Sequence, residues 1–394
     1  MSQKISSETP ARRRHVLMAL DWYDHELHRG IATCAREKNW ILNTQMSRLR
    51  TFPDGWVGDG AIGLFGDSSR LTEYLTANKI PAVDIGDRLP KHFAHIKTAN
   101  AEVGELAARH FIDRGHTRCI FVHLQNSNLE KERCAGYRAA LEAAGHQCIE
   151  WRFRRGGERR DLPYNNIRKW FSRMLAGMQP PLAVFAQNDD ASSILLTSAL
   201  EAGFRVPEQV AILGADNTEL ICEFATVPMS SVDCNLFQLG YESATLLDKL
   251  MNGCPRPRKT IEVSPKSVVL RHSTDFLAVR NPHVLAVLEY IKKHFGRGIT
   301  VEELARQISI SRSVLYRLFI EEVGHSMVEE LGRVRINHAK NLLSTTTIKI
   351  NEITTRCGFS GNISFSRAFH NAVGMSPSEY RAKHRTTASN EAPE

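Results

Sequence analysis

Side chains suited to binding a small polar ligand follow directly after two apolar runs of the sequence. Asn188 and Asp189 follow one run, and Asp216 and Asn217 follow the other. Carboxylates accept hydrogen bonds and amides both donate and accept them, so these groups can orient a ligand rich in hydroxyls. For Asp189, Asp216 and Asn217 the alternative use is capping of the helices that follow, which is common for Asp and Asn.

The elements that would position these side chains are predicted by residues 15–274, where short apolar runs alternate with helical patterns. The predicted strands are 16–20, 60–65, 82–85, 119–123, 182–186 and 210–213. The predicted helices are 27–35, 101–114, 132–144, 167–175, 191–202 and 238–251. Strands separated by helices indicate an α/β fold with a parallel sheet covered on both faces. Ligands bind beyond the carboxyl ends of such strands, which is where the polar residues above lie.

A second kind of pattern occupies residues 299–381, where a short helix, a tight turn and a basic helix occur twice. In the first copy, apolar side chains at helical spacing predict one buried stripe on each helix: Val301, Leu304, Ala305 and Ile308, then Val314, Leu315, Leu318 and Phe319. In the second copy, Gly358 stands where a helix end requires a left-handed residue. Two short amphipathic helices joined by about three residues are typical of helix-turn-helix DNA binding. The alternative is a helical bundle with accidental internal similarity.

The second copy carries a long and specific motif, made of Ile350, Ile353, Gly358, Phe359, Phe365, Arg367, Phe369, Gly374, Ser376, Pro377, Tyr380 and Arg381. This motif resembles the AraC/XylS family of transcription regulators. The resemblance implies an all-α DNA-binding domain with two helix-turn-helix motifs. A helix over 327–343, on the order of 24 Å long, would separate the two motifs.

Eight residues match the positions of family DNA contacts: Arg312, Ser313, Tyr316, Arg317, Asn362, Ile363, Ser366 and Arg367. Arginine can bind guanine through two hydrogen bonds and asparagine can bind adenine, while Tyr316 and Ile363 suit thymine methyl groups. The alternative is that some of the arginines hold phosphates or form surface pairs with Glu321 or Glu322. Leu315, Leu318, Phe319, Phe365 and Phe369 are expected in the core.

The upstream region carries several moderately specific motifs in a fixed order. They begin at His110, Arg133, Gln187, Glu201, Ala215 and Ser230. Their order resembles the effector-binding core of LacI/GalR-type repressors, a two-lobed periplasmic-binding-protein fold of type I. The resemblance implies a sugar site lined by Tyr23, Asp24, Arg133, Asn188, Asp189, Asp216 and Asn217. Ala99 and Cys234 depart from the pattern of related cores near the expected pocket.

The two resemblances together imply a sugar-responsive transcription regulator. It would be an activator that responds to xylose or a related monosaccharide through lobe closure. The chain is expected to cross between the lobes near 96–100, 233–235 and 253–261. The expected partners are double-stranded DNA, a sugar effector, RNA polymerase if the protein activates, and a second copy in a homodimer.

The expected domain organisation is a basic tail (1–14), an effector domain (15–275), a linker (276–283), a DNA-binding domain (284–385) and a C-terminal tail (386–394). The chain carries a net charge of +8, and residues 282–385 contain 15 Lys and Arg against 9 Asp and Glu. This concentration of positive charge is expected where phosphates are neutralised.

Other classes of protein find little support in the sequence. The 8 cysteines include no Cys-x-x-Cys pair, which favours free thiols in a reducing cytoplasm. No apolar run is long enough to span a membrane. We find no nucleophile elbow, no phosphate-binding glycine loop and no metal-spaced cluster, so we expect no catalytic residues, no metal and no cofactor. A transporter's solute-binding protein or an enzyme of sugar metabolism remains the alternative, since one fold serves many functions.

Overall fold

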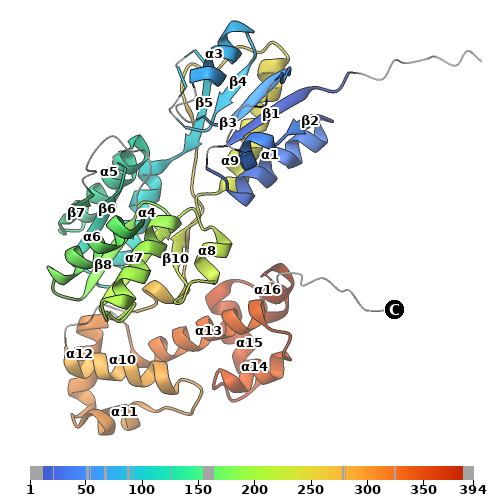
Figure 1. Cartoon of the computed structure of the whole chain (residues 1–394). Helices are drawn as coiled ribbons and strands as arrows, with labels where there is room; N and C mark the ends of the chain where they lie inside the picture. The colour runs from blue at the N-terminus through green and yellow to red at the C-terminus, as the bar shows by residue number, and fades with distance from the viewer. Residues whose placement is uncertain are drawn as a thin grey trace, which may run out of the picture. The chain divides into compact units, whose positions relative to one another are not determined.

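The chain folds into two compact units, residues 1–276 and 277–394, which are described separately (Figure 1). The computed structural model describes residues 12–20, 22–49, 53, 55–65, 69–86, 89–90, 92–125, 127–153, 164–276, 279, 281–323 and 325–384. Outside the described residues lie 1–11 of the predicted basic tail, the gaps within the predicted effector domain, 277, 278 and 280 of the linker, 324 and 385 of the predicted DNA-binding domain, and all of the tail 386–394.

The first lobe of the N-terminal unit is built on a six-stranded sheet of order β11-β5-β4-β3-β1-β2 with parallel pairings throughout. Its strands are β1 (His15–Leu20), β2 (Ile41–Asn43), β3 (Gly60–Leu64), β4 (Ala82–Asp84), β5 (Ala94–Thr98) and β11 (Ile261–Val263). Its helices are α1 (His25–Glu37), α2 (Gln45–Leu49), α3 (Ser69–Ala77) and α9 (Leu236–Met251). Val16 and Met18 pack with α1 and α9, whereas Leu17 and Ala19 pack with α3. Because both faces are covered, β1 is apolar after its first residue.

The second lobe has a six-stranded sheet of order β12-β10-β9-β8-β6-β7, in which only β12 is antiparallel to its neighbour. Its strands are β6 (Cys119–His123), β7 (Cys148–Arg152), β8 (Leu182–Ala186), β9 (Val210–Ala215), β10 (Ser230–Val232) and β12 (Val268–Val269). Its helices are α4 (Asn100–Ile112), α5 (Asn128–Ala143), α6 (Tyr164–Ala176), α7 (Asp189–Glu201), α8 (Glu219–Glu223) and the 3₁₀ turn η1 (His272–Thr274). Phe121 and Phe185 pack towards α4 and α5, and Val122 and Val184 pack towards α6 and α7.

Three segments connect the lobes, and one of the predicted crossings is wrong. The chain crosses between β5 and α4 and again between β10 and α9, near the predicted positions. The third crossing is residues 264–267 rather than 253–261, because β11 pairs with β5 in the first sheet and β12 pairs with β10 in the second. The glycine- and proline-containing run after α9 only returns the chain to the sheet of its own lobe.

The C-terminal unit consists of helices. They are α10 (Pro282–His294), α11 (Val301–Ile308), α12 (Arg312–Val323), α13 (Met327–Thr345), α14 (Ile350–Arg356), α15 (Asn362–Val373) and α16 (Pro377–His384). The unit has two cores, and α13 contributes to both. Met327 and Leu331 belong to the core with α10, α11 and α12, whereas Ile336, Ala339 and Leu343 belong to the core with α14 and α15. The predicted architecture, an α/β effector domain followed by an all-α domain with two helix-turn-helix motifs, is confirmed.

Candidate DNA-reading helices and effector cleft

The first helix-turn-helix is formed by α11 and α12. Thr300 caps the start of α11 by accepting a hydrogen bond from the Glu303 backbone N–H (3.2 Å). Ser309 ends the helix in a left-handed conformation (φ 58°). On α12, Leu315 and Phe319 are fully buried. The predicted contact residues lie on the exposed side of the same helix: Arg312, Ser313, Tyr316 and Arg317.

One residue of the predicted stripe on α12 was assigned to the wrong face. Val314 is 39% exposed. It precedes Leu315 by one residue and therefore points away from the helix face on which Leu315 and Phe319 are buried. Leu318 is half-buried and packs on the core. The helix therefore buries a narrower stripe than the sequence pattern predicts.

The second helix-turn-helix is formed by α14 and α15. Gly358 has φ +74°, the left-handed conformation that was predicted for it, and a Cβ there would lie 2.5 Å from the Phe295 carbonyl oxygen. Phe365 and Phe369 are fully buried. The predicted contact residues of α15 are all exposed: Asn362, Ile363, Ser366 and Arg367. Ile363 is 79% exposed, which leaves a large apolar side chain available for a base methyl group.

Two of the three arginines predicted to contact DNA form ion pairs on the protein surface. Arg312 Nη1 lies 2.6 Å from Glu302, and Arg317 Nε lies 4.0 Å from Glu321. Glu322 instead accepts a hydrogen bond from the Asn281 backbone N–H. Exposed pairs of this kind contribute only about 0–1 kcal/mol, so phosphate or guanine can replace them at little cost.

Arg335 on α13 joins the two halves of the C-terminal unit. Its guanidinium donates to the carbonyls of Phe295 (2.9 Å) and Arg297 (2.7 Å), just after α10. The same group lies over the Phe359 ring in the α14–α15 turn, 5.6 Å from the ring centroid. Because Gly358 also packs against Phe295, the turn of the second motif is held directly against the first half.

In the N-terminal unit, several of the predicted ligand residues gather around the buried Arg133 of α5 in the second lobe. Arg133 is 2% exposed and donates to Asp216 Oδ1 (3.0 Å), Asn100 Oδ1 (3.1 Å) and the Gln187 carbonyl. Its Nη2 also lies 3.5 Å from Cys234 Sγ. The predicted Arg133 and Asp216 are therefore brought together.

Asp189 is the second buried carboxylate of this cluster. Its Oδ2 accepts a hydrogen bond from the Thr218 backbone N–H (2.8 Å), so it holds the loop after β9 rather than capping its own helix. A Cβ on Gly214 would lie 2.2 Å from Asp189 Oδ1, which explains the glycine. Burial and the nearby Asp216 carboxylate raise the pKa of Asp189 to about 7.

The loop after β9 has strained backbone at two consecutive residues. Asp216 has φ 101° and Asn217 has φ 57°, and the Asn217 N–H donates to Ser231 Oγ (3.0 Å). Non-glycine residues rarely adopt positive φ, and such strain gathers at binding sites. Neither side chain acts as a helix cap, so the capping alternative does not hold for them.

Capping does describe two other predicted ligand residues. Asn188 caps α7 by accepting from the Ala191 N–H, and Asp24 caps α1 by accepting from the Glu26 and Leu27 N–H groups. Asp24 still reaches the second lobe, because its Oδ2 lies 3.5 Å from the Thr218 hydroxyl.

Tyr23 is not brought into the cluster by any recorded contact. It is half exposed, and its hydroxyl lies 3.1 Å from His28 Nδ1 within the first lobe.

The sequence prediction missed two residues that join the Arg133 cluster. Asn100 is 5% exposed and joins Arg133 to Glu132, and Gln187 is 6% exposed and supplies a carbonyl to Arg133. Both directly follow a strand or a crossing, which is the signal that could have identified them.

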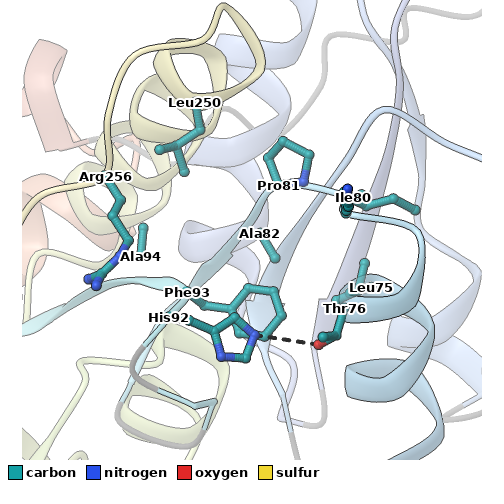
Figure 2. Close-up of a pocket in the computed structure, with 11 residues that line it drawn as sticks. Leu75, Thr76, Ile80, Pro81, Ala82, His92, Phe93, Ala94, Leu250 and Arg256 are labelled. Carbon is teal, nitrogen blue, oxygen red and sulfur yellow. Dashed lines mark hydrogen bonds between the residues drawn. The ribbon is translucent and has the colours of Figure 1, made fainter.

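A hollow of about 330 Å³ lies elsewhere in the first lobe (Figure 2). Its lining includes Ala82 and Ala94, the first residues of β4 and β5, together with His92 and Arg256. It contains none of the predicted ligand residues. Ligands of parallel sheets bind at the carboxyl ends of strands, whereas this hollow lies at the opposite ends of β4 and β5.

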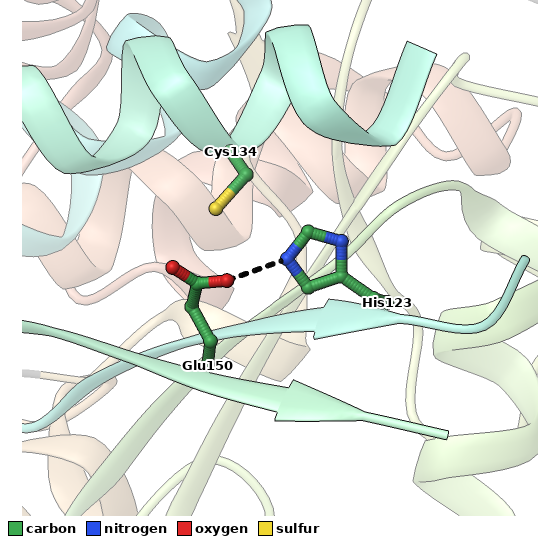
Figure 3. Close-up of side chains that lie close together, drawn as sticks. All are labelled: His123, Cys134 and Glu150. Atoms are coloured by element: carbon green, nitrogen blue, oxygen red, sulfur yellow. Dashed lines mark hydrogen bonds and ion pairs between the residues drawn. The ribbon is translucent and has the colours of Figure 1, made fainter. Parts of the chain in front are cut away.

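One group of side chains could hold a metal ion, although the sequence showed no metal spacing. His123, Cys134 and Glu150 come from β6, α5 and β7, and their donor atoms all lie within 4.8 Å of one another (Figure 3). A hydrogen bond from the Cys148 thiol lowers the pKa of Cys134, and His123 acts in the same direction.

Comparison with known proteins places the chain in a class. Residues 108–274 match a periplasmic binding protein-like domain, and residues 304–383 match a helix-turn-helix domain. The chain belongs to the DNA-binding transcription regulators that join a periplasmic-binding-protein-like domain to an AraC-type helix-turn-helix domain.

The chain is similar to individual regulators over most or part of its length. The xylose operon regulatory protein of Escherichia coli (strain K12) is 28% identical over 374 residues, which are 91% of this chain and 94% of that protein. The transcriptional repressor PurR of Aliivibrio salmonicida is 30% identical over 239 residues, 59% of this chain and 69% of that protein. The solved structure of the xylose-binding transcription activator XylR covers 95% of this chain and 100% of its own, with a TM-score of 0.66 and 25% identity. These relatives are regulators, which confirms the prediction that the chain is not an enzyme.

Proposed function

We propose that this chain is a sugar-responsive transcription activator whose effector is xylose or a related monosaccharide. The observation that carries the proposal is the buried Arg133 cluster beside the crossings between two lobes, in a chain that also has two helix-turn-helix motifs. Two relatives that match over most of the chain are named for xylose.

The polar groups of the cleft suit a ring of hydroxyls. Arg133 provides a fixed donor, while Asp189 and Asp216 provide acceptors, and hydrogen bonds to charged groups such as Arg133 are the stronger ones. Gln187 Oε1 and Asn217 Oδ1 are buried and have no hydrogen-bond partner among the described residues. Because buried polar atoms are normally paired, sugar hydroxyls are suitable partners for both oxygens.

Lobe closure is the proposed signal. Asp24 of the first lobe lies 3.5 Å from the Thr218 hydroxyl of the second lobe. A ligand bound between the lobes would add further contacts to both, and these contacts would exist only when the lobes are closed. A ligand shifts an equilibrium by its differential affinity for the two states. The closed state would then change the spacing or freedom of the attached DNA-binding units.

The DNA is proposed to be read by the eight exposed residues of α12 and α15 named above. A homodimer, contact with RNA polymerase and a cytoplasmic location complete the proposal. No described helix is long and apolar enough to cross a membrane.

The proposal is tested by measuring DNA affinity and the footprint of the full chain with and without xylose and related pentoses. We expect a sugar-dependent change that Asn217→Gly abolishes, because this change removes the amide but keeps the left-handed backbone. Asn39→Gly is the matched control, since Asn39 has φ 56° on an exposed turn. An affinity and footprint indifferent to all these sugars would overturn the proposal.

A further inference from the structure

The cluster of His123, Cys134 and Glu150 lies in the second lobe and has no part in the proposed DNA or sugar sites (Figure 3). Its members are distant in sequence and reach one place through strand register. Phe121 pairs with Glu150 and Cys119 pairs with Cys148 in the parallel β6–β7 ladder. Alternate residues share a face, so His123, Cys148 and Glu150 all face α5, from which Cys134 projects.

The cluster offers one sulfur atom, one imidazole nitrogen and one carboxylate, to which a water molecule would add the fourth position around a tetrahedral ion. Cys148 shares a face of β7 with Glu150, and its thiol donates to the Ile149 carbonyl oxygen (3.9 Å).

A buried carboxylate lies near the second ring nitrogen of His123. The Nε2 atom of His123 lies 3.0 Å from Glu150 Oε2, inside the cluster, while its buried Nδ1 has no hydrogen-bond partner and lies 3.9 Å from Glu130 Oε2. Glu130 is fully buried and held by three backbone N–H groups, those of Leu124, Gln125 and Ser127. Metal-binding histidines usually donate the second ring N–H to a carboxylate, and Glu130 lies close to that nitrogen but beyond hydrogen-bond distance.

Two partly exposed arginine side chains balance the negative charge of Glu150. Arg138 and Arg152 both pair with Glu150, and Arg138 Nη2 lies 3.6 Å from Cys134 Sγ. Their side chains are 42% and 53% exposed, so both can turn into solvent. A divalent cation would replace the positive charge that they provide.

We propose that Cys134, His123 and Glu150 form a binding site for a thiolate-preferring divalent ion of the zinc class. Sulfur and imidazole donors favour Zn²⁺ and similar ions over Mg²⁺ or Ca²⁺, which prefer oxygen. The ion itself drives loss of the Cys134 thiol proton on binding. Arg133 of the effector cleft directly precedes Cys134 on α5, so the ion would stiffen the helix that presents Arg133.

The test is titration of the reduced full chain with Co²⁺, whose bonds to sulfur produce charge-transfer absorption in the near ultraviolet. We expect one Co²⁺ per chain with tetrahedral visible bands, and displacement by one Zn²⁺. Cys134→Ser and His123→Gln should each abolish the sulfur band, whereas Cys254→Ser, at an exposed thiol in the loop after α9, should leave it unchanged. Arg138→Ala should tighten binding by removing the competing cation.

Folding of each variant is checked by DNA binding and by its thermal transition. Absence of the sulfur band in the unaltered chain, or its persistence in both Cys134→Ser and His123→Gln, would refute the site. Loss of the band in Cys254→Ser would identify adventitious binding at that thiol and would also refute it.

Discussion

Arg133 holds a positive charge in a place where water cannot reach it. It is the shared partner of Asp216, Asn100 and the Gln187 carbonyl, and three of its nitrogens are used. A buried pair loses several kcal/mol when one partner is removed, since an uncompensated charge remains. The cluster is therefore preorganised before any ligand arrives.

The protonation of Asp189 makes stability depend on pH. Its folded-state pKa is raised from 3.8 to about 7, so the folded protein binds more protons than the unfolded chain between these values. Stability that is present at low pH is therefore lost as the pH rises from about 4 to about 7. Asp189→Asn keeps the shape of the protonated acid and should unfold with on the order of 2–4 kcal/mol greater stability than the unaltered chain at pH 8.

The measurement is urea unfolding of both proteins at pH 5 and pH 8. The advantage of the variant should shrink at pH 5, where Asp189 is already protonated. An equal difference at the two pH values would show that the carboxyl does not titrate in this range.

The exposed Arg317 offers a prediction about base reading. Arg317→Ala should cost about 1–3 kcal/mol of DNA binding and relax the preference at one base position if the arginine binds guanine through two hydrogen bonds. Binding to a library of single-base variants of the site measures both effects. Uniform weakening across the library would instead identify a phosphate contact.

At the scale of elements, α13 does more than separate the motifs. Its 19 residues span about 28 Å, and its two halves serve different cores. If α13 were the only connection, side-chain packing alone would set the rotation of the second helix-turn-helix about the α13 axis relative to the first. Arg335 adds directional hydrogen bonds that fix this rotation.

Arg335→Met should therefore loosen the relation between the two recognition helices without altering either one. We expect affinity for a single half-site to stay within about twofold, while the penalty for adding or removing one base pair between half-sites becomes smaller. Competition binding with spacing variants measures this. Arg306→Met is the control, because Arg306 is exposed on α11. An unchanged spacing preference would contradict a positioning role for Arg335.

Sequence patterns predicted elements well where apolar periodicity was long, as in α4, α9 and β8. Short elements such as β2, β11 and β12 carry two or three residues each, too few to show a period. The Arg133 cluster was foreseen in part because strand exits are visible in sequence. Asn100 and Gln187 also follow a crossing or a strand, but their hydrogen bonds to Arg133 depend on the distance between strands, which sequence order does not show.

At the scale of the whole molecule, each unit has its own cores, and all proposed sugar contacts belong to the first unit. Calorimetry of the full chain should therefore show two transitions. A sugar at 100 times its dissociation constant should stabilise only the first unit, by about 2.7 kcal/mol. A shift of both transitions by sugar in the absence of DNA would show that the units unfold as one.

The position of β11 has a consequence for how the protein is made. The strands of the first sheet up to Thr98 are synthesised early, but its last strand, Ile261–Val263, leaves the ribosome only after most of the second lobe. The first sheet is therefore incomplete until that point. At translation rates of about 5–20 residues per second, this delay is on the order of ten seconds or more. The DNA-reading unit follows later still. A nascent chain therefore completes its sensor before it has any means of occupying a promoter.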